Sequence, residues 1–170
     1  ALNTLHQAIS QIRLEDFSKY NKLLEVIHTI NWNGKDFDDR LIIFTERIDT
    51  LTFLNKNLPK DLGLKENQAA ILHGSMPDVD QQQVVEDFGK DNAPVRLLIA
   101  SDVASEGINL HYLSHRMIHF DIPWSLMVFQ QRNGRIDRYG QEKTPQIIYM
   151  LTESETEKIK GDIRILEILI

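Results

Sequence analysis

Residues 40–54, RLIIFTERIDTLTFL, hold the pattern that decides the fold. The first six, 40–45, form a short apolar run rich in β-branched and aromatic side chains, which is typical of a buried strand. Apolar residues then recur every three or four positions and predict an amphipathic helix that Pro59 closes. These residues are Ile48, Leu51, Leu54 and Leu58. A strand followed at once by such a helix is the unit from which parallel sheets are built.

The same alternation of strand and helix continues in both directions along the chain. Helical spacing of apolar residues between Phe17 and Ile30 predicts a helix before the first strand. More short apolar runs bring the number of predicted strands to five; they cover residues 69–73, 95–100, 116–121 and 146–151. The predicted fold class is therefore α/β, with a doubly wound, mainly parallel sheet and helices on both faces.

Three further helices are predicted after the first two strands. One has Ser75 as its N-cap, Pro77 in its first turn and Gly89 at its end. Another, of about 10–14 residues, runs through 125–138. The tail from Glu155 onward is predicted to be helical as well.

Composition limits the functions that this chain can have. It has 170 residues, enough for one domain with a sizeable core. It contains no cysteine, which excludes disulfides and thiolate metal sites, and its six histidines lack the spacing of metal ligands. No apolar run is long enough to span a membrane. Because the net charge is −6, any binding of nucleic acid has to use a local surface.

Polar stretches follow three of the predicted strands at the point where each strand ends. Thr45 and Arg47 follow the first, the stretch 73–75 follows the second, and SDVASEGINL, residues 101–110, follows the third. Sheets of this kind bind ligands at the carboxyl ends of their strands. A ligand site is therefore expected at that edge of the sheet.

Four stretches, in order along the chain, resemble known motifs. SDVASEGINL and QQRNGRIDRYGQ, residues 130–141, resemble motifs V and VI of the superfamily II helicases, in particular of the Swi/Snf-type translocases in the bacterial RapA-like branch. The family pattern of motif VI, Q-x-x-G-R-x-x-R-x-G-Q, is complete from Gln131 to Gln141. Residues 40–54 resemble motif IV, and ILHGSMPDVDQQQVVEDF, residues 71–88, resembles the motif that follows it.

The resemblance implies that the chain is the second RecA-like lobe of a two-lobe motor. Residues 35–154 would form the lobe, residues 1–34 a helical extension and residues 155–170 a C-terminal helix. In the family, the first lobe holds most of ATP and Mg²⁺ through a phosphate-binding loop and carboxylates. The pattern of that loop, G-x-x-x-x-G-K-[ST], does not occur in these 170 residues. The chain is thus expected to supply half of an ATPase site, and to be monomeric and inactive alone.

Motif VI implies a set of catalytic residues. Arg135 and Arg138 would face the γ-phosphate across the cleft between the lobes, where guanidinium groups stabilise the transition state. Being three residues apart, they are expected on one face of a helix. Gln131 would contact carboxylates of the first lobe, and Gly134 would let the helix approach its neighbour beside the nucleotide. The alternative is a cluster of surface arginines that pair with nearby acidic residues.

The other motifs imply contacts to nucleotide and to nucleic acid. Gly107 and Asn109 would lie near the nucleotide, and Ser101 would bond a nucleic-acid phosphate or else cap a helix. Further contacts to the nucleic-acid backbone are expected at the ends of the first two strands, where they set position and not sequence. The residues are Thr45, Arg47, His73 and Gly74. For His73, a turn residue bonded to its own loop is an equally good interpretation.

Several residues near these motifs are expected to have structural roles. Asp102 and Glu106 are interpreted as organisers of the 101–110 loop or of the motif VI arginines, since carboxylates repel phosphate. Arg132 is expected to be a surface or ion-pair residue. Trp32 and Trp124 are predicted to pack in the core or at a hinge.

The predicted function is that of the second motor lobe of an ATP-dependent double-stranded-DNA translocase, which moves along DNA without separating its strands. One rival is the lobe of an RNA helicase or of another superfamily II branch; Glu106 and the RYGQ ending of motif VI argue against it. The other rival is a non-enzymatic binding module derived from a motor lobe. The expected partners are double-stranded DNA and the first lobe, with no membrane, and the expected location is the bacterial cytoplasm or nucleoid.

Overall fold

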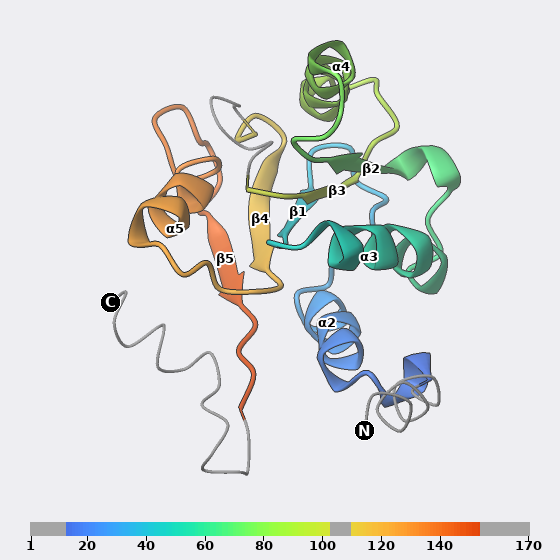
Figure 1. Cartoon of the computed structure of the whole chain (residues 1–170). Helices are drawn as coiled ribbons and strands as arrows, with labels where there is room; N and C mark the ends of the chain where they lie inside the picture. Colours follow the sequence, from blue (N-terminus) through green and yellow to red (C-terminus); the bar gives the residue numbers. More distant parts are fainter. Residues whose placement is uncertain (1–12, 103–109, 154–170) are drawn as a thin grey trace.

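In the computed structural model, which describes residues 13–102 and 110–153, five parallel strands form one central sheet (Figure 1). The strands are β1 (Arg40–Phe44), β2 (Ala69–Leu72), β3 (Leu97–Ala100), β4 (Ser114–His119) and β5 (Gln146–Tyr149). Their order across the sheet is β2-β3-β1-β4-β5, and every pairing is parallel. The predicted α/β fold with a parallel sheet is confirmed.

Helices cover both faces of the sheet, so the doubly wound architecture is confirmed as well. Because successive side chains of a strand point to opposite faces, Leu41 and Ile43 enter one core and Ile42 and Phe44 the other. The first core is shared with α2 (Ser18–Thr29) and α3 (Ile48–Asp61). The second receives Phe88 from α4 (Asp78–Gly89), and α5 (Leu126–Asn133) stacks Phe129 on residues of the same side.

One cation lies inside this apolar framework, at the start of the central strand. The side chain of Arg40 is fully buried, and its guanidinium donates to the backbone carbonyls of Asp87 at 2.9 Å and Phe88 at 2.6 Å. These carbonyls belong to the last turn of α4, where helical partners are missing. Burial lowers the pKa of Arg40 to about 10, so the group stays charged at neutral pH. Arg40 thereby fastens the end of α4 to the centre of the sheet.

Helix α3 runs past Pro59, so the prediction that Pro59 closes it is wrong. A glycine closes the helix instead: Gly63 has a φ of +67°, in the left-handed region. Its N–H donates to the Lys60 carbonyl at 3.1 Å, and the N–H of Leu64 donates to the Pro59 carbonyl at 2.8 Å. This pair of bonds is the Schellman arrangement of a glycine-terminated helix. Pro59 lies inside this last turn, where it lacks the N–H that would donate to the preceding turn.

Helix α4 begins at Asp78, with Pro77 in the N-cap position, so the prediction that Ser75 caps it is wrong. A separate turn precedes the helix, in which the N–H of Met76 donates to the His73 carbonyl at 3.0 Å. The chain therefore enters helical geometry only after this turn. The predicted end of the helix at Gly89 is confirmed.

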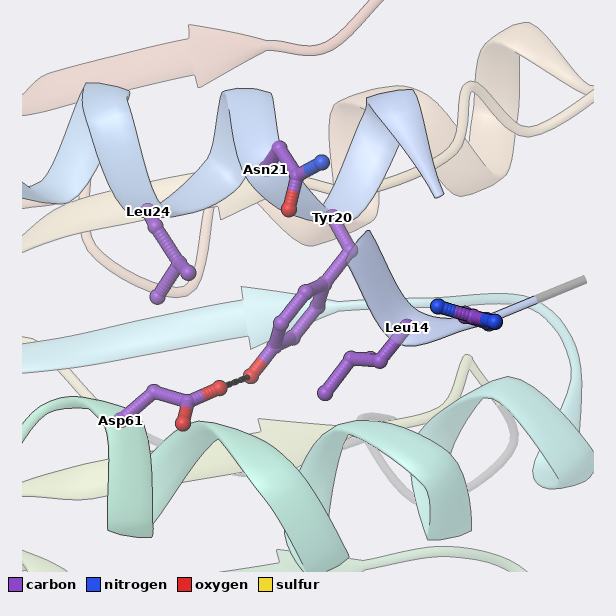
Figure 2. A pocket seen from close by; sticks show the side chains of 6 residues that line it. Leu14, Tyr20, Asn21, Leu24 and Asp61 are labelled. Carbon is purple, nitrogen blue, oxygen red and sulfur yellow. Dashed lines mark hydrogen bonds between the residues drawn. The ribbon is translucent and has the colours of Figure 1, made fainter. Parts of the chain in front are cut away.

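The helix that precedes the first strand packs as part of the lobe. Tyr20 of α2 is buried, and its hydroxyl donates to the Asp61 carboxylate at the end of α3 at 2.5 Å (Figure 2). Burial, strengthened by Asp61, raises the pKa of Tyr20. Trp32 is buried, as predicted. The division of the chain at residue 34 stays a prediction, and the predicted helix 155–170 lies outside the described residues. No helix in the described part of the chain is long and apolar enough to cross a membrane.

Candidate functional site

Polar residues that follow three of the strands meet at the carboxyl edge of the sheet. Thr45 follows β1, Ser101 and Asp102 follow β3, and Asp121 follows β4. The buried hydroxyl of Thr45 donates to the Asp121 carboxylate at 2.6 Å, and the backbone N–H of Glu46 donates to the same carboxylate at 2.9 Å. The structure thus brings the end of the central strand into contact with the end of its neighbour.

Arg132 of α5 is the centre of this polar cluster. Its side chain is fully buried and forms ion pairs with Asp102 and, at 3.4 Å, with Asp121. It also donates to the backbone carbonyl of Asp121 at 2.8 Å, and its guanidinium lies 5.5 Å from the centre of the Phe44 ring. The expectation of an ion-pair residue is confirmed, and that of a surface residue is wrong. Arg132 joins α5 to the ends of β3 and β4.

The stretch that follows Asp102 holds several of the predicted site residues. Arg132 fixes the Asp102 carboxylate, so Asp102 has a partner in motif VI. Glu106, Gly107 and Asn109 lie outside the described residues. Their expected roles stay predictions.

A second chain of hydrogen bonds leads from Arg132 to β5. The buried ring of His119 has its Nδ1 3.2 Å from the Arg132 guanidinium, which can only donate, so Nδ1 accepts and Nε2 carries the proton. Nε2 donates to the Asn133 Oδ1 at 2.9 Å, and the Asn133 Nδ2 donates to the Tyr149 hydroxyl at 3.0 Å. Sequence reasoning missed this chain because its members come from three separate elements and match no motif.

Stability is expected to fall as the pH is lowered, because His119 is held neutral. Burial, and then the charge of Arg132, lowers its pKa to about 3, whereas the pKa of histidine in an unfolded chain is about 6.5. Between these values the unfolded state binds one more proton. The His119 contribution is therefore complete above about pH 6.5 and is lost toward pH 3, with a slope of up to about 1.4 kcal/mol per pH unit.

Urea unfolding between about pH 4 and pH 7 measures this contribution as the difference in slope between the wild type and His119→Gln. The variant is expected to lose less stability on acidification. His28→Gln is the control, because His28 is exposed on α2. Equal slopes in the wild type and His119→Gln would contradict the prediction.

Arg135 and Arg138 of motif VI lie on a turn and not on a helix. Helix α5 ends at Asn133, and the bonds then shorten to a three-residue spacing, as in the 3.0 Å bond from the Arg135 N–H to the Arg132 carbonyl. The predictions of a helix through 138 and of one shared helical face are therefore wrong. Among the described residues, a Cβ at Gly134 would meet carbonyls of α5 itself, and the expected role of Gly134 beside the nucleotide stays a prediction.

Residues 134–140, the arginine turn, lead from the end of α5 to Gln141, which is bonded to Ser114 at the amino end of β4. Ile136 is buried in the second core, and the N–H of Leu110 donates to the Arg135 carbonyl at 3.3 Å. Arg135 and Gln131 are half-buried, whereas Arg138 is exposed. Burial and the positive charge of Arg138 lower the pKa of His111. The turn is thus firmly attached yet presents positive charge at its surface.

The remaining predicted contact residues are placed around this edge. Arg47 is exposed at the N-cap of α3, and Gly74 is exposed after β2. His73 is half-buried, and among the described residues nothing bonds its Nδ1, which is buried; the interpretation of a ring bonded through this atom to its own loop is not supported. Ser101 is buried beside them, at the end of β3. No three His, Asp or Glu side chains in the described ranges are placed to hold a metal ion.

Trp124 is 78% exposed, so the prediction of a packing residue is wrong. Its neighbours Ile122 and Pro123 are buried and anchor the strand exit instead. The indole is therefore available to a ligand or partner on the surface of the lobe.

A parallel five-stranded sheet between two layers of helices, with an arginine-bearing turn after α5, defines a RecA-like helicase lobe. The chain belongs to the helicase conserved C-terminal domain family, whose model matches residues 18–140. The resemblance to superfamily II helicases is confirmed by this match.

Similar proteins support the same assignment. The chain is 33% identical to the uncharacterized ATP-dependent helicase YqhH of Bacillus subtilis over 86% of its length, and 25% identical to the RNA polymerase-associated protein RapA of Pectobacterium carotovorum over 89%. It is 30% identical to the pre-mRNA-processing ATP-dependent RNA helicase PRP5 of Mycosarcoma maydis over 81%. The chain spans 24%, 15% and 11% of the length of these three relatives.

A solved structure shows the same fold. The C-terminal part of the Fun30 ATPase domain superposes with a TM-score of 0.70 at 21% identity, which covers 94% of this chain and 48% of that one. The predicted RecA-like architecture is confirmed by this superposition.

Proposed function

We propose that the chain is the second motor lobe of an ATP-dependent double-stranded-DNA translocase of the Swi/Snf type. The observation that carries the proposal is the arginine turn, which is bonded to residues 110–114 and presents Arg138 to solvent. Phosphoryl transfer is accelerated by an arginine that reaches the nucleotide from outside the phosphate-binding loop. Arg135 and Arg138 would take this role, with Gln131 beside them. ATP and Mg²⁺ would be held mainly by the first lobe.

The three arginines of motif VI divide into one structural and two functional residues. Arg132 is buried and neutralised by two carboxylates, so it has no charge to offer a ligand. Arg138 is exposed, and its charge acts on the nearby His111. The exposed guanidinium of Arg138 favours an anionic ligand such as a nucleotide phosphate. The site therefore fits a phosphate group that approaches from a second lobe.

Contacts to nucleic acid are proposed for the carboxyl edge of the sheet. Arg47, Gly74 and Trp124 are exposed there or near it, and His73 has a buried ring nitrogen that nothing described bonds. A cation, a backbone N–H and an indole are suited to phosphate contact and stacking, without reading sequence. Thr45 and Ser101 are buried, so their hydroxyls would serve nucleic acid only after local rearrangement.

The choice of double-stranded DNA rests on the Swi/Snf pattern of motifs V and VI. The relative PRP5 is an RNA helicase, and its 30% identity makes an RNA-helicase lobe the second candidate. A non-enzymatic binding module is the third, and the complete motif VI argues against it.

ATP hydrolysis is expected when this lobe is joined to its first lobe, and not by residues 1–170 alone. Double-stranded DNA is expected to stimulate phosphate release more strongly than RNA of equal length. The measurement is steady-state phosphate release for both proteins with each nucleic acid. Stronger stimulation by RNA would favour the RNA-helicase alternative. Absence of turnover with either would favour the binding module, and turnover by residues 1–170 alone would overturn the half-site proposal.

A further inference from the structure

Gln141, the last residue of motif VI, holds the arginine turn against a separate segment of the chain. Its Nε2 lies 2.9 Å from the Ser114 carbonyl and 3.2 Å from the carbonyls of His111 and Ile136. Its Oε1 accepts from the backbone N–H of Lys143 at 3.0 Å. The orientation of the amide is settled by its neighbours, because those at the nitrogen only accept and the one at the oxygen only donates.

The acceptors of Gln141 belong to two different parts of the molecule. His111 and Ser114 lie in residues 110–114, the segment that leads into β4, whereas Ile136 lies in the arginine turn. The 3.3 Å bond from the Leu110 N–H to the Arg135 carbonyl joins the same two parts. The backbone that carries the arginines is therefore bound to residues 110–114 both at Arg135 and at Gln141.

The glycine before Gln141 supplies a backbone conformation that other residues rarely adopt. Gly140 has a φ of +95°, in the region that side chains disfavour. Phosphate chemistry does not require the last two residues of the motif pattern. The backbone conformation of Gly140 and the contacts of Gln141 explain their presence.

We infer that Gln141 is a positioning residue, which holds Arg135 and Arg138 in the orientation that transition-state stabilisation requires. The inference rests on the proposed function. Arg135, Ile136 and Asp137 still donate backbone bonds to the end of α5, whereas Arg138 lies beyond them, and the amide of Gln141 supplies the constraint at that far end of the turn. Charged groups stabilise a transition state only when they are placed in advance, and an error of about 1 Å costs up to about 100-fold in rate.

The test uses the protein with both lobes and the variants Gln141→Glu and Gln141→Ala. The glutamate side chain has the same shape as glutamine. It places a carboxylate oxygen, which can only accept, where the amide nitrogen donates to the three carbonyls. At a temperature where each variant is folded by circular dichroism, kcat for ATP hydrolysis is expected to fall about 10- to 100-fold, with the KM for ATP within a few-fold of wild type. Gln82→Ala, on the exposed face of α4, is the control and is expected to keep the wild-type kcat.

A merely structural role is separated from positioning by a double-mutant cycle. If Gln141 acts through the arginines, Gln141→Glu lowers kcat little further in a protein that already carries Arg138→Ala. Hydrogen exchange at the Leu110 and Gln141 amides, which donate to the Arg135 and Arg138 carbonyls, is expected to quicken in Gln141→Glu and not in Gln82→Ala. If the glutamate variant does not fold, Gln141→Asn, which keeps the amide but shortens its reach, takes its place in both measurements.

Four outcomes decide the matter. Wild-type kcat in a folded Gln141 variant overturns the inference, and so does an equal further loss in the Arg138→Ala background. A loss of kcat in arginine variants without one in Gln141 variants overturns the inference and leaves the proposed function standing. Wild-type kcat in the arginine variants overturns the proposed function itself.

Discussion

Replacing Arg135 or Arg138 by alanine is expected to lower kcat for nucleic-acid-stimulated ATP hydrolysis by about 10³–10⁵-fold, or about 4–7 kcal/mol of transition-state stabilisation. The KM for ATP is expected to change far less, because an arginine of this kind acts on charge that develops during the reaction. Arg138 is exposed, so its removal should alter the free energy of unfolding by no more than about 0.5 kcal/mol. Steady-state kinetics and thermal unfolding of each variant measure the two effects.

The controls for this prediction test whether the geometry of the guanidinium matters, whether the two arginines act together, and whether any nearby positive charge has the same effect. Arg138→Lys is expected to recover little of the kcat that Arg138→Ala loses, since an ammonium lacks the planar fork of donors. The double variant should lose much less than the product of the single losses, because both arginines act on one phosphate. Lys143→Ala removes an exposed cation close to the turn, one that pairs with Asp38 at 2.8 Å, and should stay within a few-fold of wild type. Similar, mild losses in all of these variants would instead indicate a surface cluster.

The second large effect concerns stability. Arg132→Ala is expected to lower the free energy of unfolding by about 3–5 kcal/mol, because it leaves two carboxylates without their cation. The side chains of Asp102 and Asp121 are 21% and 25% exposed, so water solvates them in part and the lower end of this range is expected. Arg132→Lys should cost less, since it keeps the charge and loses only the forked geometry.

Chemical denaturation of the 170-residue chain measures this effect. Arg47→Ala is the matched control: Arg47 is exposed, and its loss should change stability by no more than about 0.5 kcal/mol. A change of that size in Arg132→Ala would show that the buried cluster contributes nothing to folding.

The strands were predictable because their signal is local. Residues 40–45 and 95–100 are short apolar runs rich in β-branched and aliphatic side chains, which favour a buried strand, and they contain β1 and β3. Helix ends were less predictable, since several residues compete to define them. At the end of α3, Gly63 prevails over Pro59, because a left-handed residue terminates a helix more effectively than a proline in its last turn.

The candidate site was predictable only where one motif contains all of its parts. Motif VI located the arginine turn, but it did not show that Arg132 is buried. That burial depends on Asp102 and Asp121, which come from the ends of two other strands. The prediction for Trp124 was wrong for the opposite reason. An indole side chain suggests a core position, and only the burial of the neighbouring Pro123 leaves this one exposed to solvent. Contacts between distant segments decide both cases.

The strand order has a consequence for how the lobe is made. Strand β1 is synthesised first, yet it pairs only with β3 and β4. At about 5–20 residues per second, a ribosome needs roughly 3–11 s to proceed from Leu41 to its partner Leu97. During those seconds α3, which is made next, can shield one face, while both edges of β1 remain open to other chains. The strand that is best protected in the finished lobe is therefore the one that waits longest without a partner during translation.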